Sequence, residues 1–418
     1  MTASSRALLR IAIVGYGTAG QACAALLARD GHTVDVFEQA PVLGPAGAGL
    51  LLQPTGLEVL WRMGLLGDAL KHGAIIRRLH GQNEHGRAVM DMRYADLDAR
   101  LFGLGMQRGT LFALLRSAWA DADSVRCGRR IVSVDYDSGF VRDGHGETYG
   151  PYDLVIAADG SASLLRAAIG GAQLDRQYPW AALWCLCPAD DWQPIDELRQ
   201  RYVAARKMIG LLPVGTRPDD PEPKLSFFWS LPAERIGAWE AIGLQMWKRE
   251  LAALWPEILP RLARVTDCAH LARASYRDAV LPQWQRGRLV LVGDAAHAMS
   301  PQLGQGVNMA LMDAQALCDA LRESRGLPAA LQRYERERRG HTGIYQFWSR
   351  WLTPVFQSDL DRVAALRDMF LLPLGRLPGG RGNMLRVLSG TQRGWLGKIR
   401  LSREFLQALS QSRDSAGA

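Results

Sequence analysis

The sequence contains few cysteines and no long apolar run, and both features narrow the kind of protein it encodes. Its 418 residues include 6 Cys, at Cys23, Cys127, Cys185, Cys187, Cys268 and Cys318. They are too widely spread for a disulfide framework, and no zinc-like pairing surrounds them. We therefore expect reduced side chains that pack in the interior of a cytoplasmic protein. No stretch approaches the ~18 consecutive apolar residues of a membrane-spanning helix, and residues 1–10 are too short and polar for a signal peptide.

The composition is that of a soluble globular protein with an excess of positive charge. Hydrophobic residues make up 48% and charged residues 22%, and the formal net charge is +8. Because the arginines are spread along the chain, the charge predicts an ordinary basic surface, which also suits a phosphate-rich cofactor. The length predicts two or three structural units.

The first forty residues carry the strand–turn–helix–strand pattern of a dinucleotide-binding unit. Residues 10–15 are typical of a buried strand, residues 20–30 of a helix and residues 33–38 of a second strand. Gly15 permits a tight turn, Gly17 lets the backbone approach a pyrophosphate, and Gly20 lets the helix pack closely. Glu38 ends the second strand, where its carboxylate can accept hydrogen bonds from ribose hydroxyls. This unit alone does not decide between FAD and NAD.

A second glycine cluster favours FAD. Asp294 follows a strand predicted at residues 287–293, where its carboxylate can bind ribityl hydroxyls. Pro301, Gly304 and Gly306 make a tight backbone passage that suits a flat ring. The helix that begins near Gly306 directs the positive end of its dipole at that ring. A reduced flavin is anionic around N1 and C2=O, so the dipole would favour it.

Three motifs together carry a resemblance to a known family. The first is Gly15 to Gly20 with Glu38, and the third is Gly293-Asp294 with Pro301 and Gly304-Gln305-Gly306. The second, between them, is the run Asp159-Gly160-Ser161-Ala162-Ser163-Leu164-Leu165-Arg166. In this order the sequence resembles the class A FAD-dependent aromatic hydroxylases, the para-hydroxybenzoate hydroxylase-like flavoprotein monooxygenases. The resemblance covers residues 10–345 and departs from the family at Ala162, where a polar or charged residue is usual.

The resemblance implies an α/β fold with a Rossmann-like FAD-binding domain, an inserted β-sheet substrate domain and a helical C-terminal region. The expected FAD-binding domain comprises residues 1–74, 101–178 and 275–345. The expected substrate domain comprises residues 75–100 and 179–274, and the C-terminal region residues 346–418.

The resemblance also assigns cofactor-binding residues. Glu38 would contact the ADP half of FAD, Arg108 its phosphate or ribityl region, and Asp294 the ribityl chain. Asp159 lies in a motif associated with both FAD and NAD(P)H. The complete expected set is Gly15, Gly17, Ala19, Gly20, Glu38, Gln39, Gly49, Arg108, Asp159, Gly160, Asp294, Pro301, Gly304, Gly306 and Val307.

The implied reaction is hydroxylation of an aromatic or quinone-like small molecule. NADH or NADPH would reduce FAD, and the reduced flavin would react with O2 to give a C4a-hydroperoxide that transfers oxygen to the ring. We expect no metal, no nucleic-acid partner and no protein nucleophile, and the sequence identifies no catalytic base. Two alternatives stay open: a related FAD-dependent reductase or dehydrogenase, and a flavin-binding protein that contacts membrane surfaces weakly through its basic residues 376–403.

Several other residues allow two interpretations. One set lies on predicted strands of the middle region and forms either an aromatic substrate wall or ordinary sheet core: Trp180, Trp184, Phe227, Phe228 and Trp229. His297 is expected to be a packed or capping residue rather than a proton-handling group. Residues 333–339, rich in Arg and Glu, are expected to form a solvated helix face.

Overall fold

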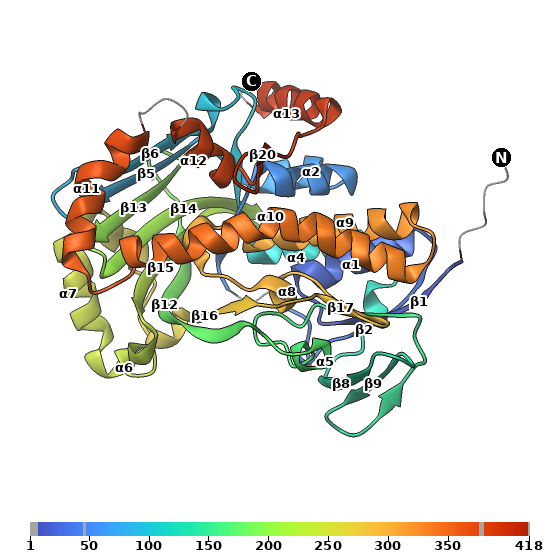
Figure 1. Ribbon diagram of the computed structural model, residues 1–418. Helices are drawn as coiled ribbons and strands as arrows, with labels where there is room; N and C mark the ends of the chain where they lie inside the picture. Colours follow the sequence, from blue (N-terminus) through green and yellow to red (C-terminus); the bar gives the residue numbers. More distant parts are fainter. Residues whose placement is uncertain (1–6, 45–46, 376–379, 417–418) are drawn as a thin grey trace.

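The computed structural model describes residues 7–44, 47–375 and 380–416 of the chain. A small parallel sheet and a large, mainly antiparallel sheet lie at opposite ends of the molecule (Figure 1). Two consecutive long helices, α9 (Gly306–Glu323) and α10 (Leu327–Phe356), run between these ends. The predicted α/β fold with an inserted sheet and a helical C-terminal region is confirmed.

The small sheet is the Rossmann-like part of the fold. Its strand order is β17-β18-β11-β1-β2, and β18, β11, β1 and β2 are parallel. The bounds are β1 Arg10–Val14, β2 Thr33–Phe37, β11 Leu154–Ala157, β17 Gln285–Arg286 and β18 Leu289–Leu291. The central strands β11 and β18 are apolar because they are buried along their whole length. Parallel strands end at the same edge, so the residues after β1, β2, β11 and β18 share that edge.

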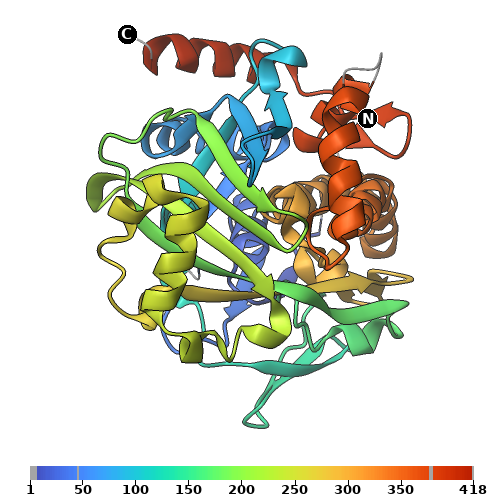
Figure 2. The ribbon, with the colours of Figure 1, turned by 90° about the vertical axis from the view of Figure 1, so that its left-hand side faces the viewer.

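The large sheet joins two distant parts of the chain. Its order is β16-β12-β15-β14-β13-β5-β6, in which β5 (Arg78–Asn83) and β6 (Ala88–Arg93) extend a sheet otherwise made from later residues. The later strands are β12 Leu174–Pro188, β13 Glu197–Val203, β14 Lys207–Arg217, β15 Asp220–Pro232 and β16 Ala272–Val280. Helices α6 (Trp239–Ile242) and α7 (Leu244–Leu254) cover its outer face (Figure 2).

Side-chain alternation along the large sheet separates two packing layers. Ile209, Phe227 and Trp229 pack with Trp247 of α7 in the outer core. Leu212, on the opposite face of β14, belongs to the core that surrounds the small sheet. The large sheet therefore turns one face towards its own helices and the other towards the small-sheet part of the molecule.

Shorter elements complete the fold. Three strands form a separate sheet, β3 Gly49–Leu52, β4 Ala74–Ile76 and β7 Gly103–Gln107, and another three form β8 Ile131–Asp135, β9 Phe140–Asp143 and β10 Thr148–Tyr149. The remaining helices before residue 300 are α1 Thr18–Arg29, α2 Pro54–Arg62, α3 Leu66–His72, α4 Arg108–Ser117, α5 Arg166–Ile169 and α8 Asp294–His297. The C-terminal region contains α11 Asp361–Gly375, α12 Gly380–Leu388, the hairpin β19 Gln392–Arg393 with β20 Gly397–Lys398, and α13 Arg403–Ala416.

The structure corrects one local prediction and refines another. The arginine-rich run at residues 333–339 is not a wholly solvated face, because Arg338 is buried with 3% of its surface exposed. The basic segment from residue 380 onward includes the β19–β20 hairpin between its helices, while residues 376–379 lie outside the described part of the chain. All six cysteines are free, as expected, and four of them are buried. Within the described residues, the helices are too short or too polar to span a membrane.

Candidate cofactor site

The loop after β1 is shaped by two glycines that other residues cannot replace without a clash. Gly15 has φ +98°, and a Cβ there would lie 2.5 Å from the Ala158 carbonyl oxygen. A Cβ on Gly20 would lie 2.0 Å from the Gly15 carbonyl oxygen. Gly17, in contrast, has no atom within 4 Å of such a Cβ. The loop is therefore packed tightly on the strand side and open at Gly17, where a phosphate would pass.

The open side of this loop faces the first turn of α1. Gly17 is the N-cap of α1 and no side chain caps the helix. The N–H groups of a first helical turn lack intrahelical acceptors and carry a partial positive charge. Gly17 and the start of α1 therefore form a site that suits the pyrophosphate of a dinucleotide.

Glu38 connects the end of β2 to the glycine loop. Its carboxylate accepts hydrogen bonds from the backbone N–H of Tyr16 and of Ala40, both at 2.8 Å. The side chain is partly buried, whereas Gln39 beside it is exposed. Each carboxylate oxygen retains acceptor capacity for a ribose hydroxyl. The Glu38 carboxylate thus both positions the loop and can hold a sugar.

The Asp-Gly motif follows β11 and contributes an unpaired carboxylate oxygen. Asp159 Oδ2 accepts a hydrogen bond from the Leu164 N–H at 3.1 Å, and its buried Oδ1 has no partner in the structure. Burial raises the pKa of Asp159. A buried oxygen without a partner is costly. Gly160, at φ +79°, leaves open space beside it.

Arg166 links this motif to the next one, a role that the sequence did not reveal. It is 4% exposed, and its guanidinium donates to the carbonyl oxygens of Ser161, Asp294 and Ala295. It also lies 3.3 Å from the carboxylate of Asp175. Arg166 therefore holds the backbone of the short helix α8 against the Asp-Gly loop.

Asp294 is the exposed residue of an otherwise buried turn. It begins α8 after Gly293, whose φ is +59°, while Ala295, Ala296 and His297 are buried. A Cβ on Gly306 would lie 3.9 Å from Asp294 Oδ1, so the carboxylate lies near the start of α9. The Asp294 carboxylate therefore offers exposed hydrogen-bond acceptors beside the start of α9.

The flavin loop, residues 301–306, has the predicted tight geometry. Pro301–Leu303 form one turn of 3-10 helix, and Gly304 follows with φ +61° and open space around it. Gln305 is anchored by donating to the Leu388 carbonyl oxygen at 2.6 Å. Asn308, in the first turn of α9, accepts from the Gln53 N–H at 2.8 Å. Gly306 and half-buried Val307 thus begin a helix whose position is fixed from two sides.

Three further residues of the predicted cofactor set are Ala19, Arg108 and Gly49. Ala19 packs beside Gly293, since a Cβ on Gly293 would lie 3.1 Å from the Ala19 Cβ. Arg108 is exposed at the start of α4, as predicted, and contacts the loop at Gly47. Gly49 lies at the start of β3, where its N–H donates to Ser226 Oγ at 3.1 Å.

An aromatic wall on the large sheet begins beside residues 301–306. We define it by four residues in successive contact: Tyr178, Tyr276, Trp184 and Phe228. Tyr178 lies 3.4 Å from the side-chain amide of Gln302, and its ring centroid lies 6.5 Å from that of Tyr276. The Trp184 Nε1–H donates to the Tyr276 hydroxyl at 3.1 Å, and the Trp184 and Phe228 centroids lie 5.1 Å apart.

The structure divides the aromatic strand residues between the two faces of the large sheet. Phe227 and Trp229 are ordinary core under α7, whereas Trp184 and Phe228 lie on the other face. Tyr178 and Tyr276 were not singled out from the sequence, because neither lies in a motif. Burial raises the pKa of both phenols, and Arg108 partly opposes this at Tyr276. Both hydroxyls therefore remain protonated near neutral pH.

The residues present fit FAD. The carboxyl edge of the small sheet offers open space at Gly17, an unpartnered Asp159 Oδ1 and an exposed Asp294 carboxylate, and the loop before α9 is open at Gly304. Within the described residues, no cluster of three His, Cys, Asp or Glu side chains is arranged to hold a metal. Fold and site together define an α/β flavoprotein, in which the carboxyl ends of the parallel strands suit a dinucleotide.

Known proteins support this class directly. The FAD binding domain family matches residues 9–343. The chain is 30% identical to 6-hydroxynicotinate 3-monooxygenase of Bordetella bronchiseptica, over 79% of this chain and 87% of that protein. It is 27% identical to the FAD-dependent urate hydroxylase of Klebsiella pneumoniae, over 79% and 86%. The crystal structure of Klebsiella pneumoniae HpxO with FAD and uric acid superimposes with a TM-score of 0.75 at 24% identity, covering 93% of this chain and 98% of that one.

The chain belongs to the FAD binding domain family, and it is an FAD-dependent monooxygenase of the aromatic hydroxylase type. This confirms the resemblance inferred from the three motifs, the cofactor FAD and the enzyme class. The relatives are named hydroxylases and monooxygenases, which favours oxygen insertion over the alternative of a reductase or dehydrogenase.

Proposed function

We propose that the protein hydroxylates an electron-rich aromatic, heteroaromatic or quinone-like small molecule bound against the aromatic wall. The observation that carries this proposal is the continuous contact from Gln302 in the flavin loop through Tyr178 and Tyr276 to Trp184. A flat ring stacks favourably on such a surface. The relatives named for hydroxynicotinate and urate act on flat, nitrogen-containing rings, which supports the same substrate class here.

The chain's residues hold the reactants and exclude water. Bound FAD, once reduced by NADH or NADPH, would activate O2, of which one oxygen atom enters the substrate and the other leaves as water. Asp294 and Glu38 offer carboxylate acceptors for cofactor hydroxyls, and the N-terminus of α1 offers donors for its phosphates. The Trp184 N–H donates to the Tyr276 hydroxyl oxygen, which acts as the acceptor in this hydrogen bond. The proton of the Tyr276 hydroxyl can therefore be donated to a substrate oxygen. The wall then orients the ring and keeps solvent away from the site of oxygen transfer.

We further propose that the cofactor residues and domain division expected from the sequence apply to this chain. Residues 75–100 and 179–274 would form the substrate domain, which is supported by β5 and β6 sharing a sheet with β12–β16. Residues 1–74, 101–178 and 275–345 would form the FAD-binding domain. Gly49 would be one of these cofactor-binding residues. A cytoplasmic location is part of the same proposal and is consistent with six free cysteines.

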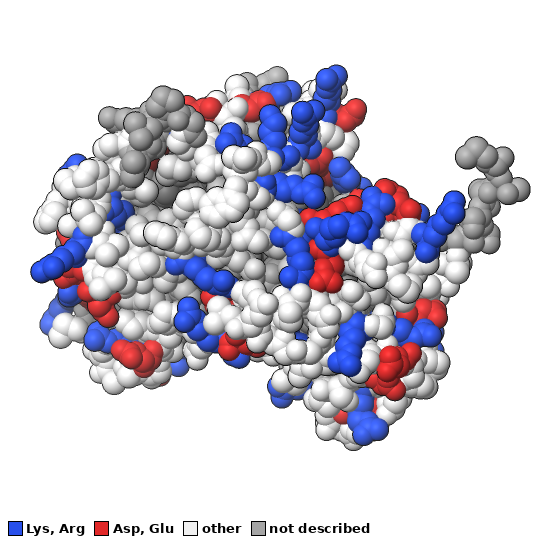
Figure 3. Space-filling view, viewed as in Figure 1, with Lys and Arg blue, Asp and Glu red and all other residues white. Residues whose placement is uncertain are grey.

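Weak contact with an anionic membrane surface is a second proposal, and one observation favours it. Leu396 and Trp395 form the tip of the β19–β20 hairpin and are 99% and 63% exposed. Lys and Arg side chains gather over the same region, near β20 and α13 (Figure 3). An exposed Trp–Leu tip beside cations is typical of interfacial binding. Sedimentation with anionic and zwitterionic vesicles tests this, since replacing both tip residues by Ser should abolish binding to anionic vesicles without changing FAD content.

The hydroxylation proposal is tested with purified, FAD-loaded protein. A screen of phenols, hydroxypyridines, quinolones and quinones should reveal compounds that accelerate NADH or NADPH oxidation. Incubation under labelled O2 should then give a product that carries one labelled oxygen atom. A product formed without labelled oxygen would contradict the proposal and indicate a dehydrogenase.

A variant of the aromatic wall tests where the substrate binds. Trp184→Leu should raise KM for the aromatic substrate about tenfold with a smaller effect on FAD content, because a stacking surface is lost. Trp351→Leu, which alters an exposed Trp on α10, is the matched control. Equal KM values for the two variants would place the substrate elsewhere.

A further inference from the structure

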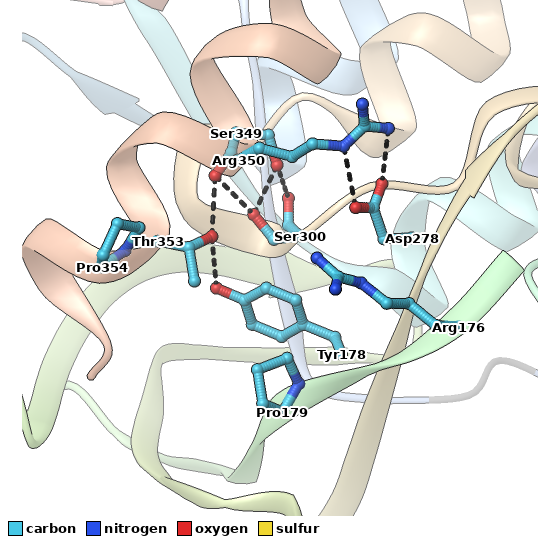
Figure 4. Close-up of a pocket in the computed structure, with 9 residues that line it drawn as sticks. All are labelled: Arg176, Tyr178, Pro179, Asp278, Ser300, Ser349, Arg350, Thr353 and Pro354. Atoms are coloured by element: carbon cyan, nitrogen blue, oxygen red, sulfur yellow. Dashed lines mark hydrogen bonds and ion pairs between the residues drawn. The ribbon is translucent and has the colours of Figure 1, made fainter. Parts of the chain in front are cut away.

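A separate pocket of about 160 Å³ lies beside the flavin loop, and no step described above uses it. It lies between β12, β16, Ser300 immediately before Pro301, and the last turns of α10 (Figure 4), and it opens to solvent at Arg176 and Pro179, which are exposed. Only its Tyr178 also belongs to the aromatic wall. The guanidinium of Arg176 points into the space between Tyr178 and Asp278 (Figure 4). We call this space the Arg176 pocket.

The Arg176 pocket carries an uncompensated positive charge. Its lining contains two guanidiniums, of Arg176 and Arg350, and one carboxylate, of Asp278. Arg350 holds both oxygens of that carboxylate, at 2.9 and 3.1 Å. The strand register places Arg176 directly opposite Asp278, yet the structure shows no ion pair between them. The carboxylate of the pocket is thus already neutralised, and Arg176 is left without a counter-ion there.

The neighbouring carboxylate does not compensate Arg176 either. Asp175 precedes Arg176 on β12, and strand alternation turns its side chain to the other face of the sheet. There it pairs with Arg166 and with Arg277. Among the described residues, no carboxylate lies within 4.0 Å of the Arg176 guanidinium. Its planar set of N–H donors is therefore available to a ligand.

Hydroxyl groups line the side of the pocket that faces the flavin loop. Ser300 and Ser349 are 5% and 1% exposed, and their hydroxyls contact each other. The Tyr178 hydroxyl donates to Thr353 Oγ1 at 2.8 Å. Hydroxyl protons rotate to meet an acceptor. These hydroxyls already bond to one another and to nearby oxygens, with Thr353 Oγ1 donating to the Ser349 carbonyl oxygen at 2.8 Å. The Arg176 guanidinium is therefore the group of the pocket that offers donors to phosphate or carboxylate oxygens.

We propose that the Arg176 pocket binds one anionic group, a phosphate or a carboxylate, of a reactant. Two reactants can supply such a group: NADH or NADPH through a phosphate, and an acidic aromatic substrate through its carboxylate. Ser300 adjoins Pro301, so an anion in the pocket would hold its molecule next to the flavin loop. Which reactant binds there depends on the proposed function, whereas anion binding by the pocket does not.

The first experiment measures anion binding without any turnover. Isothermal titration of the FAD-loaded protein with inorganic pyrophosphate, and separately with benzoate, compares the natural chain with Arg176→Gln. At least one probe should bind about tenfold more weakly to the variant, and Arg176→Lys should recover part of that loss. Arg264→Gln is the matched control, because Arg264 is 74% exposed and pairs with Glu222 at the surface. If both probes bind equally to the natural chain and to Arg176→Gln, the proposal is overturned.

The second experiment identifies the source of the anion. Flavin reduction is followed without oxygen at increasing NADH or NADPH concentration. An about tenfold higher half-saturating concentration in Arg176→Gln, with an unchanged limiting rate, assigns the pocket to a phosphate of the reductant. Unchanged reduction together with weaker benzoate binding assigns it to a substrate carboxylate. A protein that shows no flavin reduction at all would contradict the proposed function, while the titration would still test the pocket.

Discussion

His297 Nε2 lies 2.6 Å from Asp313 Oδ2, and both side chains are buried. His297 is the last residue of α8, the short helix that begins with the exposed Asp294. The Asp313 carboxylate also accepts from the Gly293 N–H at 2.7 Å, and its other oxygen accepts from Arg338 Nε at 2.5 Å. Burial opposes ionisation of Asp313, but His297 and Arg338 outweigh it and hold its pKa well below the usual range. Asp313 therefore anchors the Gly-Asp motif to α10 through a buried charge.

Removal of this charge should destabilise the protein strongly. Asp313→Asn leaves Arg338, which is 3% exposed, without its counter-ion. Breaking a buried pair in this way costs about 3–5 kcal/mol, so the free energy of unfolding measured in urea should fall by that amount. Asp319→Asn, which alters a partly exposed carboxylate paired with Arg322, should change it by less than ~1 kcal/mol. Similar values for both variants would show that the buried network contributes little.

Acid should destabilise the protein through His341. Its Nδ1 accepts from Arg338 and its Nε2–H donates to the Gly390 carbonyl oxygen, each at 2.8 Å. Burial and the Arg338 charge lower the pKa of His341 from 6.5 to about 3. The unfolded chain therefore binds a proton that the folded chain does not between pH 6.5 and 3. This contribution to stability is complete above pH 6.5 and falls by up to ~1.4 kcal/mol per pH unit as the pH is lowered through that range.

Urea unfolding between pH 7 and 5 measures this slope. His341→Asn should reduce this slope by the contribution of nearly one proton, which is about 1.4 kcal/mol per pH unit. The same substitution should also lower the free energy of unfolding at pH 7. His270→Asn, at an exposed position, should leave the slope unchanged. A slope that persists in His341→Asn would assign the acid sensitivity to other groups.

Asp294→Ala should lose most of its bound FAD while the chain remains folded. The side chain is exposed at the start of α8, so its removal leaves no cavity, but a charged acceptor for the ribityl hydroxyls is lost. Flavin absorbance of the purified variant, together with its far-UV circular dichroism, provides the measurement. Asp359→Ala removes an exposed carboxylate outside the candidate site and should retain FAD. Tightly bound flavin in Asp294→Ala would refute the ribityl assignment.

Two glycine substitutions should separate folding from cofactor binding. Gly20→Ala places a Cβ 2.0 Å from the Gly15 carbonyl oxygen and should destabilise the protein by about 1–3 kcal/mol. Gly17→Ala meets no atom within 4 Å at φ −74° and should change stability by less than ~0.5 kcal/mol. Yet Gly17→Ala should weaken FAD binding at least tenfold, because the added methyl group occupies the path of the pyrophosphate. Normal FAD affinity in Gly17→Ala would place the phosphates elsewhere.

Much of the cofactor site could be predicted from the sequence because its parts are local. Each motif directly follows a predicted buried strand, and the carboxyl ends of parallel strands must meet at one sheet edge. The structure places Gly15, Glu38, Asp159 and Asp294 after β1, β2, β11 and β18 of one sheet. The glycines at 15 and 20 are required by backbone contacts within the same unit or with the adjoining strand.

The packing of the large sheet could be predicted less fully. Side-chain alternation shows that a strand has two faces, but it does not show which face packs on helices and which faces the small-sheet part of the molecule. Phe227 and Phe228 are adjacent and equally apolar, yet Phe227 packs under α7 and Phe228 contacts Trp184. Which of the two rings faces the helices depends on the side of the sheet on which α6 and α7 pack. The sequence of α6 and α7 does not indicate that side. The roles of Tyr276 and Arg166 could not be predicted for a similar reason. Their hydrogen-bond partners, Trp184 and Asp294, lie 92 and 128 residues away along the chain.

The sequence by itself determined the cofactor class and the α/β architecture, because short-range turns and strand periodicity encode them. Only the tertiary structure decided that Arg338 is buried, that Asp313 neutralises it, and that Arg176 lacks a carboxylate partner beside Asp278. Whether a charge is paired depends on which distant segments fold against it, and the distance between two residues along the chain carries no such information.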